Sequence, residues 1–371
     1  MIDTEDAVAT AELTPLRRLW EFIVRYQAVV VPLVALGLAF SIGALLIQLQ
    51  GVNPSFAYQS LFRSALMTSD GLQRTLEKAT PLILTGLAVS IALRVGLFNI
   101  GAQGQLIFGA LGAAWVGYAW ASLPAIFLIP AALAAGTLFG AMWASISGLL
   151  KAYRGVHEVI STIMLNSIAV GIIDWLVSYP LKEDGQILQR TPEIAEQAKL
   201  PMFSFVPAGF IVSVALALAL AWLLNRTTLG FRFNTVGKNK HAARYAGIKL
   251  PGAIVGAMLF SGGLAGLGGA IETLGVVHRY ENGFNAGLGF DGITIALLAR
   301  GNPIATIPAA LLVGVLRAGA ASLQFDTGIQ PEVVDLLLAI TLLLVSIPLL
   351  AGVLFRDRAA KSEALTSGWG S

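Results

Sequence analysis

Residues 95–150 read VGLFNIGAQGQLIFGALGAAWVGYAWASLPAIFLIPAALAAGTLFGAMWASISGLL and contain no charged residue. A helix that crosses a membrane needs about 20 apolar residues, so this run is too long for a single helix. The turn Ser122-Leu123-Pro124 divides it into two predicted spans. The stretch therefore predicts a protein whose helices cross a membrane more than once.

The composition of the whole chain agrees with this. Of the 371 residues, 56% are hydrophobic and 12% are charged, against about 25% charged in a soluble domain; the mean hydropathy is +0.77. These values exclude a soluble enzyme, a disordered protein and a nucleic-acid-binding protein. The net charge of +3 comes from basic residues beside apolar runs. The chain has no cysteine, which excludes disulfides, thiolate metal sites and cysteine catalysis.

Eight further apolar stretches bring the predicted spans to about ten, and eight or nine would also fit. They are residues 28–47, 79–93, 159–181, 201–225, 250–275, 291–300, 303–323 and 332–354. The apolar runs are continuous and do not alternate with polar residues as in a membrane β-barrel. The predicted fold class is an all-α polytopic membrane protein.

Basic residues in short loops favour the cytoplasmic side. They gather before the first span, in the link 151–154, in the loop 226–249 and after residue 354. The segment 182–199 mixes acids with bases and is predicted to lie outside. Both termini are predicted to be cytoplasmic. The predicted organisation is an N-terminal cytoplasmic segment (1–25), a transmembrane domain (26–354) and a C-terminal cytoplasmic tail (355–371).

Several kinds of chemistry have no matching motif in the sequence. The phosphate-binding pattern G-x-x-x-x-G-K-[ST] does not occur, and the three histidines are scattered. We therefore expect no enzyme activity, no bound ATP and no metal site in this chain.

Pairs of glycines four residues apart are typical of close helix contacts in membranes. They occur at Gly136/Gly140, Gly252/Gly256 and Gly262/Gly266.

Four charged residues interrupt apolar stretches: Asp174, Glu272, Asp291 and Arg317. Each costs about 2.5–3.5 kcal/mol or more at the bilayer centre, so each should face protein or water. The predicted topology places all four toward the outer half of the membrane. They form either a structural ion pair with interfacial acids or a polar outer vestibule for a solute.

The segment 96–105 combines three glycines with Asn99, Gln103 and Gln105. Glycines weaken a helix, and broken helices at membrane depth occur where they are buried or line a cavity. Amide side chains there can hydrogen-bond a neutral polar solute. The alternative is a tight turn with polar helix caps near the cytoplasmic surface.

A short pattern of apolar residues ending in arginine occurs twice, at 91–94 and at 296–300. Such a pair suggests an internal repeat.

The loop 226–249 contains a short predicted helix of small residues between Gly237 and Gly247. A solvated loop does not need such residues, whereas a docking helix for another subunit does. The alternative is a positive-inside loop with one helical turn.

Five segments carry a resemblance to a known family. They are ATPLILTGLA (79–88), GLFNIGAQGQ (96–105), GVHEVISTIMLN (155–166), GKNKHAARYAGI (237–248) and GFDGI (289–293). Through them the chain resembles the permease subunits of ABC importers, in the branch for simple sugars and branched-chain amino acids. It is most similar there to nucleoside permeases that work with a BMP-type lipoprotein. The resemblance covers about residues 51–354. His157 stands where asparagine is expected in that group.

The resemblance implies partners and roles. A lipoprotein delivers the solute, two permeases, expected to be different chains, form the path, and ATPase subunits bind ATP and Mg²⁺ and drive transport. The expected location is the bacterial plasma membrane, and the expected solute is a purine nucleoside. Simple sugars, branched-chain amino acids, and an ion-coupled transporter using Asp174 and Glu272 remain alternatives. The residues predicted to couple to the ATPase are Gly237, Asn239, Ala242, Ala243 and Gly247. The residues predicted to line the solute path are Phe98, Asn99, Gln103, Asn166 and Asp291, the last nearer the outer mouth.

Overall fold

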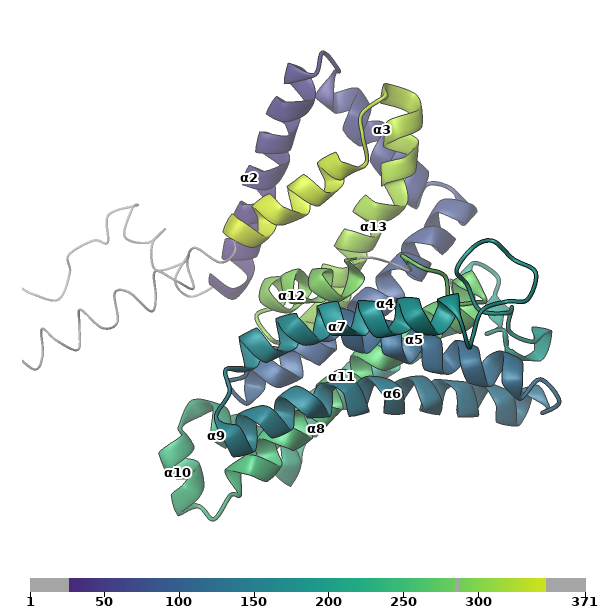
Figure 1. Ribbon diagram of the computed structural model, residues 1–371. Helices are drawn as coiled ribbons and strands as arrows, with labels where there is room; N and C mark the ends of the chain where they lie inside the picture. The colour runs from purple at the N-terminus through teal and green to yellow at the C-terminus, as the bar shows by residue number, and fades with distance from the viewer. Residues whose placement is uncertain (1–26, 284–286, 345–371) are drawn as a thin grey trace, which may run out of the picture.

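The computed structural model describes residues 27–283 and 287–344, with side chains from residue 33 onward (Figure 1). This part of the chain is predominantly helical, as the sequence predicts. The predicted N-terminal segment 1–25 and C-terminal tail 355–371 lie outside the described residues.

Most elements follow one another along the chain with short connections, whereas residues 179–207 form a long connection between α7 and α8. The helices are α2 (Gln27–Leu49), α3 (Pro54–Leu66), α4 (Ser69–Arg94), α5 (Ala102–Ala119), α6 (Ala125–Arg154), α7 (Glu158–Ser178), α8 (Ala208–Arg226), α9 (Thr228–Lys238), α10 (Lys240–Tyr245), α11 (Leu250–Glu272), α12 (Leu288–Leu298) and α13 (Pro303–Thr327). The short elements are a 3₁₀ turn η2 (Glu196–Ala198), a π turn η3 (Thr273–Val277), and strands β1 (Met202–Phe203) and β2 (Val206–Pro207). Residues 332–344 are also helical.

Within the described residues, six helices are long and apolar enough to cross a membrane: α4, α6, α7, α8, α11 together with η3, and α13. Helices α2 and α3, bent by 117° at their junction, count as a seventh if they form one span. The chain is thus a multi-pass membrane protein. The predicted count of ten is not confirmed: α5 has two glutamines near its start, α12 has 11 residues, and the predicted span 332–354 runs beyond residue 344.

Two predicted boundaries differ from the observed ones. Helix α4 begins ten residues before the predicted residue 79, at Ser69, where the Thr68 hydroxyl caps it by accepting from Gly71 N at 3.0 Å. The charge-free run misses these first turns because they carry charged residues such as Asp70 and Arg74. Helix α8 begins at Ala208 because the preceding residues form the β1–β2 hairpin.

Helices α5, α6 and α11 cross at glycines. A Cβ atom on Gly266 would lie 2.4 Å from the Gly136 carbonyl oxygen, and one on Gly109 would lie 2.1 Å from the Gly266 carbonyl oxygen. Only glycine allows backbones to approach this closely. The packing role predicted for Gly136/Gly140 and Gly262/Gly266 is confirmed. It is wrong for Gly252/Gly256 within this chain, since a Cβ there would meet at most Phe233, at 4.0 Å.

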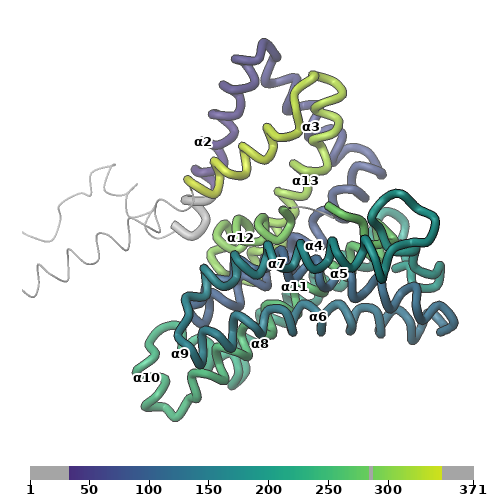
Figure 2. The backbone as a smooth tube through the Cα atoms, viewed as in Figure 1, coloured from purple at the N-terminus to yellow at the C-terminus, as the bar shows by residue number. Residues whose placement is uncertain are grey.

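The two ends of the helix bundle carry different connecting segments (Figure 2). One end carries α9, α10 and the link from α6 to α7. The Arg94 side chain lies at this end and donates to the Gly301 carbonyl oxygen at 3.2 Å. Thus the two similar motifs at 91–94 and 296–300 end side by side, each followed by a glycine with positive φ: Gly96 (74°) and Gly301 (67°).

The opposite end carries the connection between α7 and α8, which is fastened to the residues after η3. Thr191 N donates to the Tyr280 carbonyl oxygen and Ile194 N to that of His278, both at 2.9 Å. Ion pairs such as Arg279–Glu193 at 3.0 Å add to this contact. A hydrogen bond from Lys199 lowers the pKa of the Glu193 carboxyl group. The predicted outer segment 182–199 therefore lies at the end remote from α10.

Candidate functional site

The link between α4 and α5 turns back into the bundle. Gly96 has a φ of +74°, a left-handed conformation that glycine adopts without strain. Residues 97–100 then run back beside α11 before α5 begins at Ala102. The side chains of Asn99, Gln103, Gln105, Asn166 and Ser261 come together here, and we call them the amide cluster. Each of them is at most 7% exposed.

Asn99 is the centre of the amide cluster. Its Nδ2 donates to Gln105 Oε1 at 2.8 Å and to Ser261 Oγ at 2.7 Å, and its Oδ1 accepts from Gly101 N at 2.9 Å. Ser261 in turn donates to the Ala88 carbonyl oxygen at 2.6 Å. The side chain thus ties the broken segment to both α4 and α11, and its buried polar atoms are satisfied.

The amide cluster lies deeper than the sequence-based topology places it. Ser261 is the twelfth of the 23 residues of α11, so Asn99 lies near the middle of that span. A tight turn near the cytoplasmic surface, the alternative that the sequence left open for residues 96–105, does not fit this position. The reason is the reversal at Gly96, which returns the chain into the bundle.

The amide cluster also joins the starts of two helices. Gln103, in the first turn of α5, accepts from Gly289 N in the first turn of α12 at 2.8 Å. Asn166 Oδ1 accepts from Gly104 N, and its Nδ2 donates to the Ile100 carbonyl oxygen, both at 2.9 Å. A helix start carries partial positive charge and free N–H groups. The amide oxygens stabilise both starts at membrane depth.

Glycine makes the contact between α5 and α12 possible. A Cβ atom on Gly289 would lie 2.2 Å from Gln103 N, closer than any real contact. The backbones of α5 and α12 therefore touch at Gln103 and leave no room for a solute between them at this point. Whether Asn99, Gln103 and Asn166 line the path stays a prediction, as it does for half-buried Phe98.

Asp291, the fifth predicted path residue, lies two residues beyond Gly289. Its carboxylate is 2.6 Å from Arg317 Nη2, which is also 3.1 Å from Asp335. Asp291 thus lies two residues from the glycine that contacts Gln103, but its carboxylate is paired with Arg317 on α13. Glu272, at the end of α11, is 3.9 Å from Lys78 Nζ. These contacts match the structural ion pair rather than free acids in a vestibule.

The predicted docking helix is present as α10. Asn239 caps it, since Oδ1 accepts from His241 N at 2.9 Å and Ala242 N at 3.0 Å. Ala242 is exposed and Ala243 is completely buried. The helix is followed by Gly247, with φ of +73°.

Two further residues, Gly237 and Tyr245, bear on the position and the exposed surface of α10. A Cβ atom on Gly237 would lie 2.0 Å from the Arg94 carbonyl oxygen, so this glycine seats α9 against the end of α4. Tyr245 is 95% exposed at the end of α10. Tyr245 is not among the coupling residues predicted from the sequence. An aromatic residue in a loop of small and basic residues is a signal that could have found it, because exposed aromatic side chains often anchor interfaces.

The chain is similar to known permease proteins. Residues 71–346 match the family model described as branched-chain amino acid transport system / permease component. The chain is 38% identical over 331 residues to the guanosine ABC transporter permease protein NupP of Bacillus subtilis, covering 87% of this chain and 94% of that protein. It is 33% identical over 353 residues to the nucleoside ABC transporter permease protein NupB of Lactococcus lactis, covering 92% and 97%.

A third relative is the glucose ABC transporter permease protein TsgB13 of Haloferax volcanii, 34% identical over 325 residues that cover 84% of this chain and 85% of that protein. The match to the family model spans most of the membrane helices described above, including the amide cluster and α10. The chain belongs to the family of branched-chain amino acid transport system permease components.

Proposed function

We propose that this chain is a permease subunit of an ATP-driven importer and forms part of the path for nucleosides, with purine nucleosides as the first candidates. The observation that carries the proposal is the 38% identity to a guanosine permease over 87% of the chain. A relative named for glucose keeps a simple sugar as the second candidate. The proposed location is the bacterial plasma membrane, with α10 on the cytoplasmic side and residues 182–199 outside.

The proposed partners are an ATPase that binds ATP and Mg²⁺, a second permease expected to be a different chain, and a solute-binding lipoprotein. The exposed face of α10 supports the first of these, because it offers Ala242 and Tyr245 to another protein at one end of the bundle. The ion-coupled alternative, which would use Asp174 and Glu272, is less well supported, since Lys78 Nζ already lies 3.9 Å from the Glu272 carboxylate.

Uptake by cells tests the solute class. Cells that lack nucleoside uptake and express this chain with the ATPase, permease and lipoprotein of its own transport system should accumulate labelled guanosine. An excess of another purine nucleoside should compete, whereas glucose and leucine should not. Omitting the ATPase is the control and should abolish accumulation. Uptake of glucose in place of guanosine would show that the solute is a simple sugar. Uptake without the ATPase would favour the ion-coupled alternative.

Gln103 is the residue that best tests whether the amide cluster lies on the solute path. Gln103→Ala removes the bond to Gly289 N, a buried hydrogen bond of about 1 kcal/mol, or up to about 3 kcal/mol where its partner stays unsatisfied. We expect uptake of guanosine to fall roughly fivefold or more, with normal amounts of permease in the membrane.

Asn99→Ala is the comparison variant for Gln103→Ala. It removes the hydrogen bonds of the Asn99 side chain with Gln105, Ser261 and Gly101. We therefore expect it to lower the amount of folded permease as well as uptake. Parental uptake by the Gln103→Ala variant would make the amide cluster a purely structural support for the two helix starts.

A further inference from the structure

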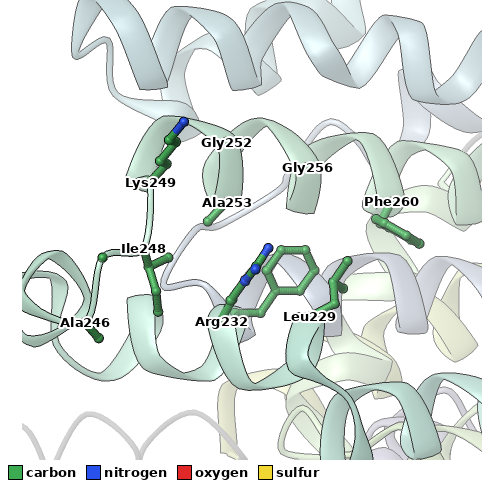
Figure 3. Close-up of a pocket in the computed structure, with 11 residues that line it drawn as sticks. Leu229, Arg232, Ala246, Ile248, Lys249, Gly252, Ala253, Gly256 and Phe260 are labelled. Carbon is green, nitrogen blue, oxygen red and sulfur yellow. The ribbon is translucent and has the colours of Figure 1, made fainter.

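A groove of about 570 Å³ lies between α9 and the beginning of α11 (Figure 3). Gly252 and Gly256 form its smooth wall on α11, with Phe260 further along the same helix. A Cβ atom on Gly252 would meet nothing within 4 Å, and one on Gly256 would be 4.0 Å from the Phe233 ring. The two glycines therefore hold the groove open instead of packing against another helix of this chain.

The groove runs into the membrane-spanning part of α11. Helix α11 belongs to the span Leu250–Val277, and with a rise of about 1.5 Å per residue Phe260 lies about 15 Å along the axis from Leu250. Phe260 is 42% exposed and the neighbouring Leu259 is 37% exposed. The far end of the groove is thus continuous with an apolar surface at the depth of lipid chains.

The other end of the groove is positively charged. Arg232 on α9 and Lys249 before α11 line it, both are exposed, and neither pairs with an acidic side chain among the described residues. Figure 3 shows Arg232 directed into the space between α9 and α11, and Lys249 at the start of α11 with its amine directed away from that space. The surrounding segment 226–249 contains six lysines and arginines and no acid.

We infer that this groove binds one anionic phospholipid. An acyl chain lies along Gly252, Gly256 and Phe260, the phosphate is held by Arg232, and Lys249 adds positive charge at the same end of the groove. Basic pockets between helices at the cytoplasmic surface are suited to acidic lipid headgroups. A soluble ATPase would not reach the far end of the groove, which lies about 15 Å along α11 from Leu250 within the apolar span. A second permease would bring its own positive loops to the same level and would be repelled by this charge.

Native mass spectrometry of the purified full-length chain tests the inference. The probes are phosphatidylglycerol and phosphatidylcholine of equal chain length. We expect one phosphatidylglycerol to be retained in preference to phosphatidylcholine. Each basic residue near an anionic headgroup contributes about a fivefold effect on affinity, so Arg232→Gln with Lys249→Gln should weaken retention about twenty-fivefold.

Two other variants make the test specific. Arg226→Gln removes one charge from an exposed residue of the same loop that does not line the groove, and it should retain the lipid. Gly256→Leu keeps both charges but fills the groove, and it should lose the lipid while eluting normally in size-exclusion chromatography. Equal retention of the two lipids, or unchanged retention in the double variant, would overturn the inference. So would loss of the co-purified ATPase or second permease in the Gly256→Leu variant with lipid retention unchanged, because the groove would then seat a subunit.

Discussion

Ala242→Glu should reduce solute uptake at least about tenfold while leaving the permease folded and in the membrane. Ala242 is exposed on α10, and its backbone N–H is already capped by Asn239, so the new side chain disturbs nothing inside this chain. At a docking surface, a buried charge without a partner costs about 3 kcal/mol or more, which is more than tenfold in binding. Uptake is measured together with the amount of ATPase that co-purifies with the permease.

Two variants serve as comparisons for Ala242→Glu. Ala242→Ser keeps a small side chain and should transport normally. Tyr245→Ala removes the most exposed aromatic side chain of α10 and should also release the ATPase. Ala243→Glu does not test docking, because Ala243 is completely buried and the substitution would disrupt α10 itself. Normal uptake by Ala242→Glu at normal expression would show that α10 is not the coupling helix.

Gly266→Ala should destabilise the permease by about 3 kcal/mol, because one methyl group overfills the place where α6 and α11 cross. Its Cβ would lie 2.4 Å from the Gly136 carbonyl oxygen and 2.8 Å from Gly140 Cα. Those atoms are backbone, so the two helices must separate. We expect a lower yield of folded protein and an apparent unfolding temperature several degrees lower, measured in detergent by the loss of the monodisperse peak after heating.

Gly171→Ala is the matched control for Gly266→Ala. Gly171 is an exposed residue in the interior of α7, and a Cβ there would meet nothing within 4 Å. Alanine is favoured over glycine in a helix by about 1 kcal/mol, so this variant should be as stable as the parent or more so. If Gly266→Ala were as stable as Gly171→Ala, α6 and α11 would not cross as closely as the structure shows.

The sequence predicted the features that depend on a single stretch of chain. Long apolar runs placed α6, α7, α11 and α13, and two of the three glycine pairs marked real helix crossings. The loop with clustered bases and small residues contains α10. Runs without charge were less useful at helix ends, where α4 extends through charged residues and α12 is a short piece.

The tertiary structure alone decided which distant residues meet. Asn99 bonds with Ser261, 162 residues later, and Gln103 with Gly289, 186 residues later. It also decided that Asp291 pairs with Arg317, and that Ala242 rather than Ala243 faces outward. Hydropathy is a property of each stretch by itself, and therefore reports which residues can enter a membrane. The depth and pairing of a polar side chain depend on the partners that the folded chain brings to it, because a buried polar group is stable only where it is hydrogen-bonded.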